Sequence, residues 1–287
     1  MFHFVRSTAA KGLNAARIAT YHKHHRQQAN IRLAAIEATQ GKTDPAQIRF
    51  AQDYAADVLG SKIYAPWLVA YTAFTGTFKE GWIPDNYFGR VVTPRLNGAH
   101  GQLPSHKSTS HQYFGSDAFP NIGSWVNGLF YSATGEIVAE ADFCRLLFED
   151  TDRIIFKLDA SAQGLDVHVI DQADFDINWI KAAGNGVFQR YVEQHEVLST
   201  FSPSAAAPLR LTTVIDDHGN CTLRASYLKL GRLGEKSTLS TSQIRIIIDL
   251  ETGQFSDLGH YTNWTSLSQH PDTGIAFAGH AVPHFAD

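Results

Sequence analysis

Cysteine is scarce in this chain. Its two copies, Cys144 and Cys221, lie far apart and make none of the close spacings that hold a metal ion. We therefore interpret both as reduced thiols in the core of a cytoplasmic protein. The residues alone leave a disulfide between them open.

Long basic runs and long apolar runs are also missing. The chain has 24 Lys and Arg against 28 Asp and Glu, a net charge of −4, so we expect no nucleic-acid partner. The apolar run at residues 1–22 is too short and too interrupted for a signal peptide or a membrane span. These features predict a cytoplasmic protein without a membrane span, and they give no indication of its oligomeric state.

Apolar residues are present in ordinary amounts. A chain of 287 residues that is 44% hydrophobic can form two or more subdomains with sizeable cores. Residues 8–60 have a helical composition, and Thr43-Asp44-Pro45 is typical of a helix start. The strongly apolar stretch 62–78 predicts a further helix or helix pair. We therefore expect a helical N-terminal region over residues 1–77.

The segment Tyr21-His22-Lys23-His24-His25 could suggest a metal site. Adjacent histidines on a helix point to different faces, so few of them could share one ion. We expect a solvated basic face of a helix.

Short strands and helices alternate beyond residue 78. Asn127-Gly128 is typical of a tight hairpin turn between two strands. The remaining patterns predict a short helix at 105–116, an amphipathic helix at 141–150, and strands at 119–132, 136–140, 153–160, 221–233 and 243–255.

The stretch from Arg153 to Thr213 suggests a nucleotide pocket between sheets. Lys157 interrupts an apolar strand, and a lysine that faces a cleft needs an anion. The loop 160–165 is small enough to cover phosphates with its backbone amides. An edge lysine that reaches solvent, followed by an ordinary hairpin loop, explains the same residues equally well.

Residues 231–238 imitate a phosphate-binding loop. Glu235 separates Gly234 from Lys236, the glycine spacing is too short, and no helical pattern follows. We reject this segment as a Walker motif.

The order of features over residues 78–287 resembles the sugar-transfer-associated ATP-grasp proteins related to α-L-glutamate ligases. The most specific pieces are the segment Gln189–His195 and the terminal His-Pro-Asp-Thr-Gly with Gly-x-x-x-Pro. The other pieces are FKEGWIPDNYF with TPRLNG, FPNIGSWVNGLFYSATGEIV, IIFKLDASAQGLDVHVI, LRLTT and IDLETGQF.

This resemblance implies a mixed α+β class, an ATP-grasp fold in which two α+β subdomains clasp ATP after an N-terminal helical region. The ATP-grasp domain would span residues 78–287. Its parts would be a linking part at 78–150, the lid and hinge at 151–195, and an incomplete C-terminal subdomain at 196–287.

The resemblance also implies roles for residues that bind ATP. Lys107 and Lys157 would contact its phosphates. The lid over the triphosphate would contain Ser161, Gln163 and Gly164. The hinge that reads adenine and ribose would contain Gln189, Tyr191, Val192 and Glu193, with Gln194 and His195 just beyond it.

Three further residues would serve the reaction. Arg210 would stabilise the transferred phosphoryl group and the acyl phosphate, and Lys229 and Arg232 could hold an acidic substrate. The implied activity is an ATP-dependent ligase that joins a carboxylate to an amine, or a similar nucleophile, through an acyl phosphate. Its substrates would be small molecules related to the cell envelope or to polysaccharides.

Several segments depart from the family pattern. The lid keeps only Gly164, Ala207-Pro208-Leu209 precedes the strand arginine, and Ser237-Thr238 and Ser242-Gln243 replace an Asp-Asn and a Gly-Gly pair.

Mg²⁺ is expected by resemblance, but its ligands are not identifiable. In the family, a Trp-Asp strand and a Glu-x-Asn strand that bind the metal follow Gly-x-x-x-Pro, and the sequence in hand ends at Asp287. Asp249, Glu251 and Asp272 have the pattern of turn residues. We expect either part of a longer enzyme or a homologue without turnover that binds a nucleotide or another ligand.

Overall fold

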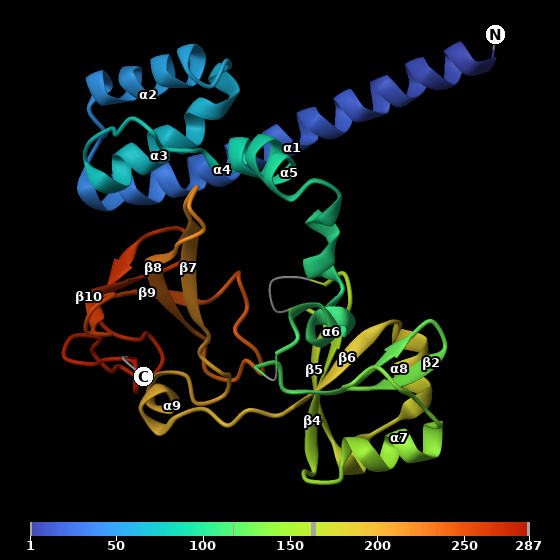
Figure 1. The fold of residues 1–287 in the computed structure, drawn as a ribbon. Coiled ribbons are helices and arrows are strands. Elements are labelled where there is room, and N and C mark those ends of the chain that lie inside the picture. Colours follow the sequence, from blue (N-terminus) through green and yellow to red (C-terminus); the bar gives the residue numbers. More distant parts are fainter. Residues whose placement is uncertain (1, 117, 162–164, 286–287) are drawn as a thin grey trace. The chain divides into compact units, whose positions relative to one another are not determined.

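The computed structural model describes residues 2–116, 118–161 and 165–285 (Figure 1). Contacts within these ranges define two compact units. The first contains the residues up to Gly101 together with Asn263–Thr265, and the second contains the rest. The predicted domain division at residue 77 stays a prediction.

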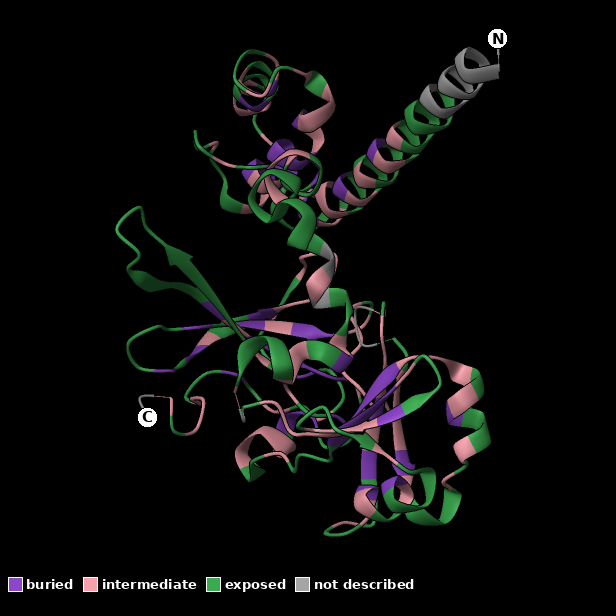
Figure 2. Ribbon diagram, turned by 45° about the vertical axis from the view of Figure 1, so that its right-hand side comes forward, coloured by how far each residue is buried: buried purple, intermediate pink, exposed green. Residues whose placement is uncertain are grey.

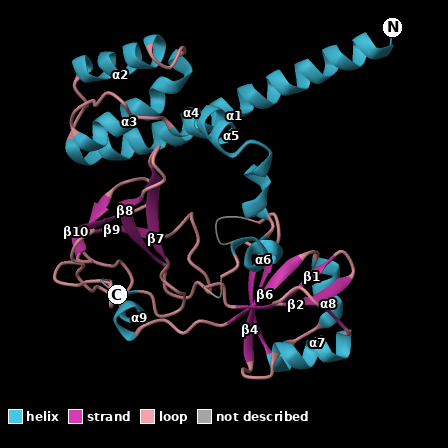
Figure 3. Ribbon diagram, in the orientation of Figure 1, coloured by secondary structure: helices cyan, strands magenta, loops and turns pink. Residues whose placement is uncertain are grey.

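The first unit is helical, as the composition of residues 8–60 predicted (Figure 3). Its α2 begins where expected: Asp44 caps the helix by accepting from the backbone N–H of Ala46 at 2.8 Å, and Pro45 is the first helical residue. Its elements are α1 (Phe2–Gln40), α2 (Pro45–Asp57), η1 (Lys62–Tyr64), α3 (Ala65–Thr75), α4 (Asp85–Tyr87), η2 (Phe88–Val92) and α5 (Thr93–Asn97).

The core of this unit corrects the interpretation of the histidine segment. His22 is buried and lies 3.2 Å from the amide nitrogen of Asn86, and His25 accepts from the indole N–H of Trp67 at 3.0 Å. Burial lowers the pKa of both histidines. Lys23 and His24 are exposed, as predicted, whereas His22 is buried and His25 is half-buried, so these last two residues belong to the packing of the unit rather than to a solvated basic face.

The strands of the described residues form two sheets, both in the second unit, which confirms the mixed α+β class (Figure 3). The six-stranded sheet has the order β3-β2-β1-β6-β4-β5 and is antiparallel throughout. Its strands are β1 (Asn121–Val126), β2 (Leu129–Ser132), β3 (Ile137–Val138), β4 (Arg153–Leu158), β5 (Val167–Asp171) and β6 (Gly186–Arg190). The turn between β1 and β2 has Asn127 and Gly128 at φ 50° and 89°, which confirms the predicted hairpin.

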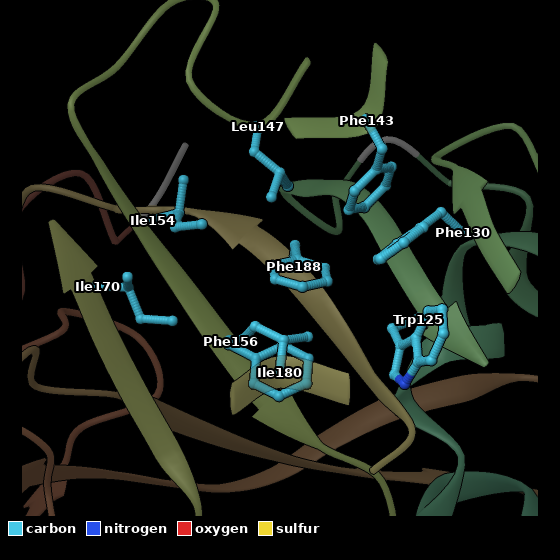
Figure 4. Packing of buried hydrophobic residues seen from close by; sticks show 9 residues of the cluster. All are labelled: Trp125, Phe130, Phe143, Leu147, Ile154, Phe156, Ile170, Ile180 and Phe188. Carbon is cyan, nitrogen blue, oxygen red and sulfur yellow. The ribbon is translucent and has the colours of Figure 1, made fainter. Parts of the chain in front are cut away.

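One face of this sheet packs against the helices α7 (Glu140–Leu147) and α8 (Ile177–Ala183). Phe156 and Phe188 lie at its centre, with ring centroids 4.6 Å apart, and Phe143 of α7 packs on Phe188 at 5.3 Å (Figure 4). Alternation along β4 places Ile154 and Phe156 in this core and turns Ile155 and Lys157 to the opposite face.

The second sheet has five strands in the described residues, in the order β11-β10-β9-β8-β7. They are β7 (Leu209–Ile215), β8 (Cys221–Leu230), β9 (Ile244–Ile248), β10 (Phe255–His260) and β11 (Ser266–Leu267). The core lies on the face that carries Leu228, Leu230 and Ile246, against Phe201 of α9 (Glu196–Phe201) and Phe277. Figure 2 shows buried residues on the strands of the sheets and also on the helices of the first unit.

The two cysteines differ from expectation in their burial. Cys144 is half-buried on α7, whereas Cys221 is exposed at the start of β8, where the hairpin with β7 has few neighbours. Both thiols are free, but Cys221 is not a core residue. Separately, none of the helices among the described residues has the length and apolar character needed to cross a membrane.

Candidate functional site

A cavity of about 610 Å³ lies in the second unit, and its lining comes from both sheets and their flanking loops. Its first wall is the face of the six-stranded sheet opposite the Phe156 core. There Ile155 pairs with Val169 and Gln189, and Lys157 pairs with Val167. The alternation that buries Phe156 therefore directs Ile155 and Lys157 into the cavity.

Lys157 is the most buried cation of this wall. Among the described residues no hydrogen bond or ion pair involves its ammonium group. Burial lowers the pKa of Lys157, and the nearby positive charge of Lys107 lowers it further. A half-buried ammonium without an acidic neighbour is poorly solvated, and an anion in the cavity would relieve this cost.

The second wall carries more positive charge. Lys229 reaches the cavity from β8, and Lys236, Ser237 and Thr238 line it from the loop between β8 and β9. With Arg190, four cationic side chains line the cavity, and no aspartate or glutamate occurs among its described lining residues. This charge distribution suits a polyanion such as the triphosphate of a nucleotide.

An apolar strip accompanies these charges. Ile155, Val167 and Val169 present branched side chains on one sheet face, and Tyr191 and Val192 continue the lining beyond β6. A flat aromatic base can pack on such a strip while its phosphates extend toward the lysines.

Lys107 does not line the cavity. It lies at the start of a short turn, η4 (Lys107–Thr109), and its ammonium donates to the carbonyls of Leu158 and Ser161 at 2.8 and 2.7 Å. The turn is fixed to the end of β4 because Asp159 accepts from the N–H and hydroxyl of Ser108. The structure thus brings Lys107 and Ser161 together, beside Lys157. The lid residues Gln163 and Gly164 lie outside the described residues.

Some residues of the predicted hinge line the cavity, and others lie outside it. Gln189, Tyr191 and Val192 line the cavity, although the Gln189 amide also donates to Asn121 at 2.7 Å. Glu193 is exposed. His195 is exposed too and caps α9, where its Nδ1 accepts from the N–H of Val197 at 3.2 Å. The adenine- and ribose-binding roles of these hinge residues stay predictions.

Gln194 links two loops. Its amide nitrogen donates to the Ser202 carbonyl at 3.0 Å, and its amide oxygen accepts from the Ala207 N–H. This side chain therefore fixes the connection from α9 to β7, the strand that carries Arg210.

The three residues predicted to serve the reaction lie in different surroundings. Arg210 is exposed on β7, and its charge helps to lower the pKa of Lys229, although burial lowers it more. Arg232 lies beyond the end of β8 and forms a two-point ion pair with Asp272, with distances of 2.7 and 2.6 Å. Of the three, only Lys229 lines the cavity.

The described residues do not fit a magnesium ion at this cavity. Magnesium needs oxygen ligands, usually one or two carboxylates beside the phosphates, and the described lining offers no carboxylate. Asp249 instead accepts from the N–H groups of Glu251 and Thr252, as the predicted turn requires.

Several lining residues were missed in the sequence. Ile155, Val167 and Val169 follow from strand alternation around Lys157, a signal that could have identified them. Lys236 belongs to the segment 231–238, which was rejected as a Walker motif, so no binding role was predicted for it. The loop after Gly231 has no helix, which confirms that rejection, but it brings Lys236 to the cavity through tertiary contacts.

Comparison with known families provides an independent finding. Residues 178–287 match the family model described as sugar-transfer associated ATP-grasp, which confirms the resemblance inferred from the sequence. No curated protein and no solved structure matches the chain. The family match supports ATP-dependent ligase-type activity on small molecules.

Proposed function

We propose, from the match of residues 178–287 to the ATP-grasp family model, that this chain is an ATP-dependent ligase that joins a carboxylate to an amine or a similar nucleophile through an acyl phosphate. The observation that supports this most directly is the cavity itself. Four cations and no described carboxylate line it, beside an apolar strip that suits adenine.

In the proposed reaction, a carboxylate oxygen of the acid substrate attacks the γ-phosphorus of ATP. The bond from that phosphorus to the β–γ bridging oxygen breaks, and ADP leaves. The amine then attacks the acyl carbon, inorganic phosphate departs, and the amine proton passes to solvent or to the phosphate. Such a reaction depends on positioning and on neutralisation of phosphate charge more than on covalent steps by the protein.

Different residues of this chain would bind the phosphates and the adenine. Lys157 and Lys229 would hold phosphate oxygens from opposite walls of the cavity, and Ile155, Val169 and Tyr191 would pack on adenine. Arg210 lies on the strand next to Lys229 and would approach the transferred group from the side of the second sheet. The family description names only an association with sugar transfer, and on that basis the proposed substrate is a small molecule related to the cell envelope or to polysaccharides.

The test is phosphate release from ATP in the presence of a panel of carboxylates and amines, with Lys157→Ala as the site variant. We expect release with at least one pair of substrates and its loss in the variant. Lys23→Ala, which removes an exposed lysine of α1, is the matched control and should keep the wild-type rate. Unchanged release in Lys157→Ala would refute the assigned site.

A second candidate function is a nucleotide-binding protein without turnover. The observation that favours it is the misfit between the described lining and a magnesium ion. Thermal denaturation with ATP distinguishes the two, because binding to the folded state alone raises the unfolding temperature. A shift without phosphate release on any pair supports the binding protein, and no shift contradicts both candidates.

A further inference from the structure

A row of three cations, Arg210, Lys229 and Arg245, lies on the face of the five-stranded sheet opposite its core. Lys229 of β8 pairs directly with Arg245 of β9, and Arg245 pairs with His260 of β10. On the other side of β8, Arg210 pairs with Tyr227, two residues from Lys229 and on the same face. Strand register therefore brings Arg210, Lys229 and Arg245 together.

These three cations have no ion-pair partner in the part of the chain that the structure describes. None of the ion pairs of the described residues includes Arg210, Lys229 or Arg245. Arg210 and Arg245 also repel the protonated form of Lys229. Like charges opposite each other on neighbouring strands destabilise a sheet, so this arrangement costs the free protein stability.

Arg245 is nevertheless held in place. With the Gln243 amide oriented so that its oxygen faces the guanidinium, this oxygen accepts from Nε and Nη2 of Arg245 at 3.1 Å each. Gln243 is buried and lines the cavity, as does Lys229. The row therefore begins at the cavity and leads away from it across β9.

Arg232, the arginine that the sequence suggested for an acidic substrate, is already paired with Asp272. Arg245 is in none of the ion pairs of residues 2–116, 118–161 and 165–285, and it is half-buried beside Lys229. A guanidinium fixed by an amide and free of a carboxylate is well suited to bind a carboxylate or phosphate through two hydrogen bonds.

We propose that Arg245, next to Lys229 and Arg210 at the phosphates, binds an anionic group of the acid substrate other than the carboxylate that is phosphorylated. The acid substrate is thus at least a dianion, with its second carboxylate or phosphate over β8 and β9 and its reacting carboxylate toward the cavity. Arg245 then determines which acids are accepted. This inference rests on the proposed ligase function and specifies its substrate class.

The test measures binding of small acids by isothermal titration at constant ionic strength. The probes are propionate, with one carboxylate, glutarate, with two, and glycerol 3-phosphate, with a phosphate alone. We expect glutarate to bind about tenfold more tightly than propionate, and Arg245→Gln to remove about tenfold of that affinity while changing propionate binding less than twofold. Glycerol 3-phosphate shows whether the row prefers phosphate to carboxylate; its affinity should also fall in Arg245→Gln.

Two variants serve as controls. Arg224→Gln makes the same change of charge on β8 at an exposed position outside the row, and it should leave every affinity unchanged. Arg245→Lys keeps the charge and should retain part of the glutarate affinity. The unfolding temperature of Arg245→Gln should equal or exceed that of the wild type, because a repelling charge is removed.

The outcomes separate this inference from the proposed function. If Arg245→Gln lowers the affinities for propionate and glutarate equally, Arg245 does not bind a second anionic group. The same conclusion follows if Arg224→Gln and Arg245→Gln change the affinities equally. ATP binding, followed by thermal denaturation, should be unchanged in Arg245→Gln. If wild-type protein does not bind ATP, the proposed function fails, whereas the acid titrations still decide what the row binds.

Discussion

Asp272 holds Arg232 through two hydrogen bonds of 2.7 and 2.6 Å and accepts a third from the backbone N–H of Leu233 at 2.9 Å. The preceding His270 is fully buried, and its Nε2 lies 3.1 Å from the carbonyl oxygen of Gly231. The His-Pro-Asp-Thr-Gly segment therefore fixes the chain beyond β8, at the start of the loop that lines the cavity with Lys236.

We expect Asp272→Asn to lower the free energy of unfolding by about 2 kcal/mol, because charge-assisted hydrogen bonds are lost and Arg232 stays unpaired. Arg232 lowers the pKa of Asp272 most, and the Leu233 N–H adds to this. The stabilisation is therefore complete above about pH 4, the ordinary range of aspartate, and is lost as the pH falls through the lower folded-state value. Denaturation at pH 7 and below pH 4 measures it.

The control for this prediction is the exposed pair of Arg145 and Asp142, which has a similar spacing of charges but little burial. Asp142→Asn should change the free energy of unfolding by at most about 0.5 kcal/mol at either pH. If both variants lose the same amount, the two-point pair of Arg232 is not a structural anchor.

Lys157→Met should have opposite effects on stability and on binding. Removal of a half-buried ammonium without a partner should raise the free energy of unfolding of the free protein by about 1 kcal/mol. The same change should weaken ATP binding at least about tenfold, because a phosphate contact is lost. Urea denaturation and nucleotide titration test the two halves.

The gain in stability should depend on pH. Burial and Lys107 lower the folded-state pKa of Lys157, so the wild-type protein becomes more stable as the pH rises from that value toward about 10.4, the ordinary range of lysine. The advantage of Lys157→Met should shrink over the same interval. A wild-type protein that stays more stable than the variant at pH 7 contradicts the prediction.

Glu193 and Gln194 are neighbours for which we predict opposite phenotypes. Gln194→Ala breaks the links to Ser202 and Ala207 and should cost about 1–3 kcal/mol of unfolding free energy. Glu193→Gln changes an exposed side chain and should leave stability within about 0.5 kcal/mol, but it should weaken ATP binding if the carboxylate contacts ribose. Denaturation and nucleotide titration on both variants decide, and a stability loss in Glu193→Gln argues against the assignment.

Gly186→Ala tests the pairing that presents Lys157. A Cβ at Gly186 would lie 2.6 Å from the Lys157 carbonyl oxygen and 2.7 Å from the Phe156 ring, so β4 and β6 would have to separate. We expect a loss of about 1–3 kcal/mol in unfolding free energy and weaker ATP binding. Gly12→Ala, where no atom lies within 4 Å of the added Cβ, should be neutral or slightly stabilising. Equal stability of the two variants would show that the sheet tolerates the added methyl group.

The local sequence alone determined much of the secondary structure. Asp44-Pro45 fixed the start of α2, Asn127-Gly128 fixed the β1–β2 turn, and alternation around Phe156 fixed which face of β4 is buried. These features depend on side chains within a few residues of each other, so the local sequence encodes them. The family resemblance, confirmed over residues 178–287, supplied the expectation of an ATP site.

Only the tertiary structure decided which charges are free. Arg232 and Arg245 are both arginines near strands of one sheet, but Asp272 folds back onto the first, and none of the ion pairs among the described residues includes the second. His22 and His25 enter a core because Asn86 and Trp67 pack against them from distant segments. The charge balance of a site depends on such long-range partners, which the local pattern of residues does not encode.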